Sequence, residues 1–453
     1  MILPCMSAVA GSQCRIWSPV FPVTGYAVSG GAICARNHSY GQKVTGAVDS
    51  EVSLGGQADA DRWQRAVWQV CGGYLWYYAA IGAYSPFLAL YLRDIGFSGV
   101  QVGLLTALPS VGVAIGGPIL GAIADSLGTH RWVLRVGLAA GVALALAASL
   151  TESFGVMFAI IALLAVALAS VPSLLDSYAV TTSERRGRSY GALRVWGSIG
   201  YMAAVLLMGR AMGDNVSSAL FAGYAICLGL TLVAIAGLPP LAERRRQPLL
   251  TGVRAVARNR PLTVLLLVAY LLSASAAVMN TYLGVHLESI GGSASLIGAA
   301  FALSAASELP VVAFGGWFLN RLGATRLAGL AIGVYTVRFI AYSLITVPDW
   351  VLGIQLLHGL SYGAFLMASV TLAHRLAGRE QAATAQALLT AMSFGFGSIT
   401  GSLVGGAFLD AVGTDGLFRG AAVVMLLTLG VLVIGDRVVG LGGAPATSAP
   451  ARD

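Results

Sequence analysis

The sequence predicts an all-α membrane protein of about twelve transmembrane helices arranged in two six-helix bundles. Its 453 residues are 57% hydrophobic and only 10% charged, and the mean hydropathy is +0.80. A water-soluble chain of this length needs far more charged surface, so lipid must be the solvent for most of it. Two further observations support this fold class: recurring apolar runs of about 20 residues and a sequence that occurs twice.

The apolar runs are continuous and do not alternate between apolar and polar residues. This pattern favours helices over the strands of a membrane barrel, because only closed barrels and helices satisfy the backbone in lipid. In chain order, the predicted spans are 68–92, 101–124, 132–150, 155–178, 190–210, 217–238, 262–284, 294–317, 327–347, 350–372, 382–406 and 416–435.

An internal repeat divides these spans into two halves. Residues 121–131 read GAIADSLGTHR, and residues 316–326 read GWFLNRLGATR. The same offset of 195 residues, from 121 to 316, places YLRDIG (91–96) over HLESIG (286–291). Two similar halves, each with a short basic turn after its second helix, are typical of membrane proteins built from structural repeats.

The repeat and the composition together define the expected domains. We expect one bundle over 66–240 and a second over 261–438, joined by the basic connector 241–260, part of which should form an amphipathic helix on the inner membrane surface. Residues 1–60 and 439–453 are expected to be disordered because they are rich in small residues. A misassigned start codon, with the true start near residue 50, is an alternative explanation of the first segment.

The distribution of positive charge predicts the orientation in the membrane. Each turn is numbered by the predicted span that it follows. Arginines flank the even-numbered turns, while the odd-numbered turns carry mainly acidic residues. Positive charge stays on the cytoplasmic side, so both termini are predicted to be cytoplasmic, in an inner or plasma membrane. The net charge of +8 is therefore not a nucleic-acid signal. The arginines beside the even-numbered turns are Arg131, Arg135, Arg185, Arg186, Arg188, Arg244, Arg245, Arg246, Arg254, Arg258, Arg260, Arg321, Arg326, Arg375 and Arg379.

The repeated turn carries the motif G-x-x-x-D-x-x-G-x-x-R, which resembles the signature loop of the major facilitator superfamily. Its glycines allow close helix approach and a tight turn. Its acid can accept hydrogen bonds from a helix end, and its arginine can pair with a carboxylate. The resemblance implies a turn that latches the cytoplasmic face and releases it during transport. The residues of the two copies are Gly121, Asp125, Gly128 and Arg131, and Gly316, Asn320, Gly323 and Arg326.

Three further stretches narrow the resemblance. IGAYSPFLALYLRDIG (81–96), YGALRVWGSIGY (190–201) and QLLHG (355–359) are similar to helices of lactose permease and of the phenylpropionate permease branch. The resemblance implies a secondary active transporter of a small polar organic solute, which is a sugar, a nucleoside or an aromatic acid. Alternating access and proton symport are the expected mechanism.

Charged side chains inside the predicted spans are the candidate site residues, because each costs at least about 2.5 kcal/mol at mid-bilayer. Asp176 and Arg194 lie 18 residues apart, from 176 to 194, which is the spacing of the carboxylate and arginine that hold the sugar in lactose permease. The resemblance implies that Asp176 accepts hydrogen bonds from the solute and that Arg194 donates them. The alternative is a structural salt bridge near the cytoplasmic ends of these helices, among the nearby basic residues Arg185, Arg186 and Arg188.

Glu308, Arg338 and His358 lie at similar depth in three successive predicted spans, as does the proton-coupling cluster of lactose permease. The resemblance implies that Glu308 carries the proton, that Arg338 favours its release and that His358 relays it or binds the solute. A buried Glu308–Arg338 pair with His358 as a core residue is the alternative. Ser361 stands where the permease has its proton-releasing carboxylate, so Glu308 or Asp176 must carry any coupled proton.

Aromatic side chains complete the predicted binding site, and two other functions remain open. Tyr84 and Tyr201 could stack on a sugar or an aromatic ring. An exporter of the same fold is disfavoured because the fifth span lacks the glycine-proline motif of drug antiporters. A multi-pass enzyme or sensor is the more distant alternative, and we find no nucleophile–base or metal motif. We therefore expect no enzyme activity, cofactor or metal, no nucleic-acid partner, and a monomer in the lipid bilayer that handles a small solute and protons.

Overall fold

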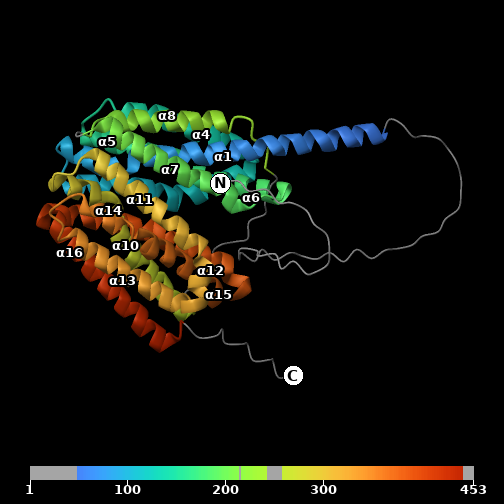
Figure 1. Cartoon of the computed structure of the whole chain (residues 1–453). Helices are drawn as coiled ribbons and strands as arrows, with labels where there is room; N and C mark the ends of the chain where they lie inside the picture. The colour runs from blue at the N-terminus through green and yellow to red at the C-terminus, as the bar shows by residue number, and fades with distance from the viewer. Residues whose placement is uncertain (1–47, 214–215, 242–257, 442–453) are drawn as a thin grey trace, which may run out of the picture. The chain divides into compact units, whose positions relative to one another are not determined.

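The computed structural model describes residues 48–213, 216–241 and 258–441, and all of the regular secondary structure in these ranges is helical (Figure 1). The two ends of the chain, 1–47 and 442–453, and most of the predicted connector, 242–257, lie outside the described residues. Helix α1 begins at Val48, inside the segment 1–60 that the sequence analysis expects to be disordered. Extending a helix that is already nucleated adds a hydrogen bond for each residue fixed, so α1 continues beyond the membrane span.

The helices follow one another in two sets (Figure 1). The first set is α1 (Val48–Asp94), α2 (Gly99–Val111), the π-helix η1 (Gly112–Gly116), α3 (Gly117–Leu127), α4 (His130–Ala148), α5 (Phe154–Leu168), α6 (Val171–Arg186), α7 (Tyr190–Met212) and α8 (Ala219–Ala234). The second set is α10 (Arg260–Ser289), α11 (Ala294–Ala313), α12 (Gly315–Leu322), α13 (Ala324–Tyr342), α14 (Trp350–Gln355), η2 (Gly359–Gly363), α15 (Ala364–Thr390), η3 (Ala391–Gly397) and α16 (Ser398–Val439).

These helices give the twelve spans that the sequence predicts. Nine helices among the described residues are long and apolar enough to cross a membrane. The long helix α1 and the shorter apolar helix α8 add two more. The last of the nine is two spans divided at Gly413, where φ is 70°. This left-handed conformation favours glycine and breaks the helix where the sequence places a turn.

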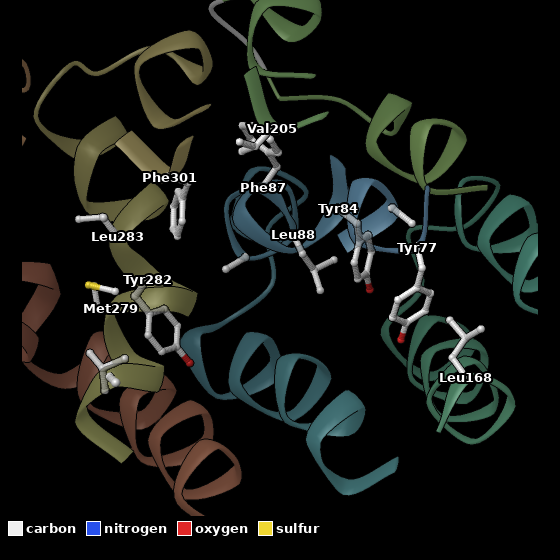
Figure 2. Packing of buried hydrophobic residues seen from close by; sticks show 14 of the residues in the cluster. Tyr77, Tyr84, Phe87, Leu88, Leu168, Val205, Met279, Tyr282, Leu283 and Phe301 are labelled. Carbon is white, nitrogen blue, oxygen red and sulfur yellow. The ribbon is translucent and has the colours of Figure 1, made fainter. Parts of the chain in front are cut away.

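The two sets of helices have equivalent packing. In the first half, α1 packs against α7 and α8, and in the second, α10 packs against α16. Figure 2 shows Tyr77, Tyr84 and Phe87 from the first half and Met279 and Tyr282 from the second in this buried core. The packing therefore follows the sequence repeat, as expected for a fold built from two related bundles.

The halves meet along two seams that the repeat also relates. A Cβ atom on Gly103 would lie 2.5 Å from the Ser402 carbonyl oxygen, and one on Gly298 would lie 2.6 Å from that of Val205. Gly103 and Gly298 are 195 residues apart in the sequence, and each lets its helix approach the opposite half at backbone distance. Both seams lie toward the odd-numbered turns, so the halves are closed together on that side.

Asp410 of the second half strengthens one seam with polar contacts. Its Oδ1 accepts a hydrogen bond from the Gly99 backbone N–H at 2.7 Å, and its Oδ2 accepts one from Val100 at 3.0 Å. Arg93 pairs with the same carboxylate at 3.3 Å. The free N–H groups at the start of α2 are thus capped by an acid from the other half, which the positive end of the helix dipole favours.

The repeated turns lie at the opposite ends of the same helices. Gly128 ends α3 with φ 60°, and Gly323 precedes α13 with φ 75°. Both values require the left-handed region, which explains the glycines of the motif. Arg131 and Arg326 are exposed, and the side chain of Asp125 lies outside the described set. The geometry thus accounts for the turn, whereas the predicted gating role of these residues stays a prediction.

Candidate functional site

Asp176 is held by tyrosines from two other helices. It lies half-buried on α6, and its Oδ1 accepts a hydrogen bond from the Tyr190 hydroxyl of α7 at 3.0 Å. The Tyr74 hydroxyl of α1 donates to the same oxygen. Tyr74 is only 1% exposed. The carboxylate is therefore fixed between three helices of the first half, and neither tyrosine was identified from the sequence.

Arg194 lies beside this carboxylate and contacts aromatic side chains. One Nη1–H donates to the Tyr78 hydroxyl at 2.8 Å. The guanidinium also lies over the Tyr78 ring at 5.1 Å and the Tyr74 ring at 5.7 Å, within the range of cation–π contacts. Tyr74 thus links Asp176, through its hydroxyl, to Arg194, through its ring. The two residues that the sequence pairs are brought together, and their described contacts run through tyrosines.

Glu308, His358 and Arg338 form a chain of contacts in the second half, so the structure brings together the three residues that the sequence groups. His358 Nε2 lies 3.0 Å from Glu308 Oε1, and His358 Nδ1 lies 3.1 Å from Arg338 Nη1. A guanidinium can only donate, so Nδ1 must be the acceptor of this hydrogen bond. We therefore assign the ring proton of a neutral His358 to Nε2, which donates to the Glu308 carboxylate.

Arg338 is fully buried, with an exposed fraction of 0%, and its remaining contacts are to neutral groups. Nη1 donates to Ser361 Oγ at 2.8 Å, and Nη2 donates to Tyr342 Oη at 2.9 Å and Gln355 Oε1 at 2.7 Å. Ser361, which stands where lactose permease has a carboxylate, thus contacts the arginine directly. Gln355 was within reach of sequence reasoning, because it is an uncharged polar residue in an apolar span.

A π-helix and a glycine place His358 beside Glu308. The segment η2 follows His358, and a Cβ atom on Gly359 would lie 2.0 Å from the Ser307 carbonyl oxygen. The Gly359 N–H also donates to Ser307 Oγ at 2.9 Å. This contact brings α11 and η2 together at the level of Glu308, and π-helical turns frequently occur at functional positions. Tyr362 then stacks on the His358 ring, with centroids 5.4 Å apart.

The two predicted aromatic residues lie in different surroundings. Tyr84 is 6% exposed and stacks on Tyr224 of α8 with ring centroids 4.5 Å apart. It therefore belongs to the buried core between α1 and α8, and Figure 2 shows it among the hydrophobic residues of that core. Tyr201 is half-buried on α7, and its backbone lies against α1, where a Cβ atom on Gly82 would be 2.6 Å from the Tyr201 carbonyl oxygen.

Two polar side chains that the sequence analysis missed lie at equivalent positions in α1 and α10. Ser85 and Asn280 are both exposed, although the residues one turn away on the same helix faces, such as Leu88 and Leu283, are buried. A polar side chain exposed within a buried helix face of a membrane protein is expected to meet a water-filled cavity. The two positions are 195 residues apart, so comparing the repeats for polar pairs could have found them.

The architecture and the site define the class of protein. Two equivalent helix bundles meet around charged side chains inside the membrane spans, which is the design of a membrane solute transporter. Among the described residues, no group of three histidines, cysteines or acids could hold a metal ion.

The chain belongs to the MFS_1 like family, whose model matches residues 67–420. It is 30% identical to a maltose permease of Geobacillus stearothermophilus over 342 residues, which cover 74% of this chain and 86% of that protein. It is 24% identical to a probable 3-phenylpropionic acid transporter of Escherichia coli, over 78% of this chain and 94% of the relative. The fold is similar to the crystal structure of the nucleoside transporter NupG, with a TM-score of 0.72 and 18% sequence identity. The match covers 83% of this chain and 98% of the NupG chain.

Proposed function

We propose that this protein imports a neutral, hydroxyl-rich solute, such as a sugar or a nucleoside, together with a proton. The main support for this proposal is which charged side chains are exposed enough to contact a solute. Asp176 and Glu308 are partly exposed, the latter by 29% of its side chain, whereas Arg338 is fully buried. Arg194 is the partly exposed cation of this group. Two reachable carboxylates and one reachable cation favour hydrogen-bond donors such as hydroxyls and disfavour an anionic acid.

In this proposal the solute binds between Asp176 and Arg194 on one side and Glu308 and His358 on the other. Asp176 and Glu308 accept hydrogen bonds from hydroxyls, and Arg194 donates to a solute oxygen. Tyr201 offers a ring against which the solute can pack. Tyr84 is omitted because it lies in the core between helices. The names of the relatives, a maltose permease and a nucleoside transporter, agree with a hydroxylated solute.

Glu308 is the proposed proton carrier. In its ionised form it accepts the hydrogen bond of neutral His358, which in turn accepts one from Arg338. Protonation of Glu308 removes the negative charge at the end of this chain of contacts and weakens its hold on His358. The charge of Arg338 is then balanced less well, and this favours release of the proton from Glu308 after the solute has left. Solute and proton thus share one carboxylate.

Movement of the two halves completes the proposal. The seams at Gly103 and Gly298 close the halves on the side of the odd-numbered turns, which the charge distribution assigns to the exterior. Rocking of the bundles opens this side and closes the other, where the repeated turns with Arg131 and Arg326 lie. We propose that these turns gate the cytoplasmic face of a monomer in the inner or plasma membrane.

Uptake by proteoliposomes tests the proposed solute class. The purified protein is reconstituted, an inward proton gradient is imposed, and labelled maltose, uridine and 3-phenylpropionate are offered in separate samples. We expect accumulation of maltose or uridine that an uncoupler abolishes, and no accumulation of the acid. Accumulation of 3-phenylpropionate alone would contradict the charge argument. Expulsion of preloaded solute under the same gradient would indicate an exporter of this fold.

A further inference from the structure

The two carboxylate oxygens of Asp176 have different surroundings. Both tyrosine hydroxyls donate to Oδ1. Oδ2 receives no hydrogen bond from the described residues. It is also not one of the buried polar atoms without a partner, so it is not sealed inside the protein. One carboxylate oxygen has room for about two hydrogen bonds. The protein therefore fills one oxygen and leaves the other accessible.

The two tyrosines that donate to the carboxylate differ in burial. Tyr74 is buried in the middle of α1, with 1% of its surface exposed. Tyr190 is the first residue of α7, follows the turn at Gly187, and is 36% exposed. Hydrogen bonds from two helices to the same oxygen fix both the position and the rotation of the carboxylate plane. Oδ2 is then the oxygen that remains for a ligand.

We propose that Tyr74 and Tyr190 are positioning residues that turn Asp176 so that Oδ2 alone accepts a hydrogen bond from the solute. This inference rests on the proposed binding role of Asp176. It makes the site select a solute with a hydroxyl or N–H group at one defined point, because only one acceptor oxygen is free. The tyrosines do not touch the solute, so removing their hydroxyls should weaken binding without changing the turnover of bound solute.

Single hydroxyl deletions test the proposal. Tyr190→Phe and Tyr74→Phe keep the rings and remove one donor each. We expect each to raise the KM for labelled maltose or uridine about tenfold, the size of one hydrogen bond to a charged group, with an unchanged maximal rate. The double variant should raise KM by more than the product of the two, because either hydroxyl alone still restrains Oδ1. Tyr178→Phe, two residues from Asp176 on α6, removes a hydroxyl without a described partner and should behave as wild type.

The outcomes separate this inference from the proposed function. Wild-type uptake with an unchanged KM in Tyr190→Phe would overturn the positioning role and leave the function intact. A lower maximal rate with unchanged KM would show a merely structural role and overturn it as well. No uptake of either solute by wild-type protein would overturn both. Should Tyr74→Phe fail to fold because the residue is buried, Tyr190→Phe at the exposed start of α7 decides the question.

Discussion

The two halves of the molecule share one helical plan but hold their intramembrane charges in different ways. In the first half, half-buried Asp176 and Arg194 are bonded to tyrosine hydroxyls, and part of the carboxylate stays free. In the second half, Arg338 is sealed from solvent, and a neutral histidine connects it to Glu308. In the proposed function, the first arrangement offers groups to a ligand, whereas the second transmits a change of charge inward from one carboxylate.

This difference suggests a division of labour between the repeats. A buried arginine cannot bind a solute, but its energy depends strongly on whether a nearby carboxylate is ionised. A carboxylate and an arginine that stay within reach of solvent can exchange hydrogen bonds with water for hydrogen bonds with a solute. Glu308 belongs to both descriptions, because it is partly exposed and also bonded to the buried chain. We therefore expect changes at Glu308 and Arg338 to affect coupling more than changes in the first half.

The largest expected effect is on proton movement in Glu308→Gln. The amide keeps the size of the side chain and can accept a hydrogen bond from His358, but it carries no proton. We expect solute-driven proton uptake to disappear, while exchange of labelled for unlabelled solute continues and the protein stays folded. The measurement is the external pH beside an exchange assay on the same proteoliposomes. Proton uptake at the wild-type level would remove Glu308 from the coupling mechanism.

Arg338→Met should have the next largest effect. We expect it to lower both the stability of the protein and the rate of transport. The variant leaves the polar groups of Gln355, Ser361 and Tyr342 without their shared donor. Breaking a buried charged network of this kind costs about 3–5 kcal/mol, so a marked fall in the melting temperature is expected. Arg419→Met, at an exposed arginine of α16, is the matched control. Equal melting temperatures for the two variants would show that the Arg338 contacts contribute little.

The seams between the halves should respond to a single methyl group. Gly103→Ala and Gly298→Ala each place a Cβ atom about 2.5 Å from a backbone oxygen of the other half, so the seam must separate or the backbone must shift. We expect faster amide hydrogen exchange in α2 and α16, or in α7 and α11, and slower uptake. Gly333→Ala, where the added atom meets nothing within 4 Å, is the control. Unchanged exchange in both seam variants would contradict the closed contacts described here.

Asp410→Asn should give the smallest effect. The amide oxygen can accept one of the two hydrogen bonds that α2 donates, but the amide nitrogen cannot accept the other, so the variant removes one acceptor together with the charge that faces the helix dipole and Arg93. Such a charge is worth about 0.3–1 kcal/mol near a surface, which corresponds to a twofold to fivefold change in the equilibrium between closed and open seams. The expected result is a KM change of this size. Asp349→Asn, at an exposed acid on the same membrane side, serves as control, and equal effects of both variants would argue against a specific role for Asp410.

The sequence was sufficient for the fold and for the charged residues of both clusters, but not for the tyrosines that contact Asp176. Apolar runs, the repeat and rare charged residues are local signals, so the twelve spans and the group of Glu308, Arg338 and His358 could be found without tertiary structure. Tyr74 and Tyr190 could not, because tyrosines are common in membrane helices and their partners depend on how α1, α6 and α7 pack. Tyr84 shows the same limit: α1 is apolar on most of its surface, so its pattern does not reveal which tyrosine faces α8.

The most direct test of coupled transport is the change of external pH when solute is added to proteoliposomes without any imposed gradient. Maltose, uridine and 3-phenylpropionate are added separately, and empty liposomes are the control. We expect the external medium to become more alkaline with maltose or uridine, to stay unchanged with the acid, and to lose the response in Glu308→Gln. Solute entry measured by label without any pH change would contradict proton symport and the role proposed for Glu308.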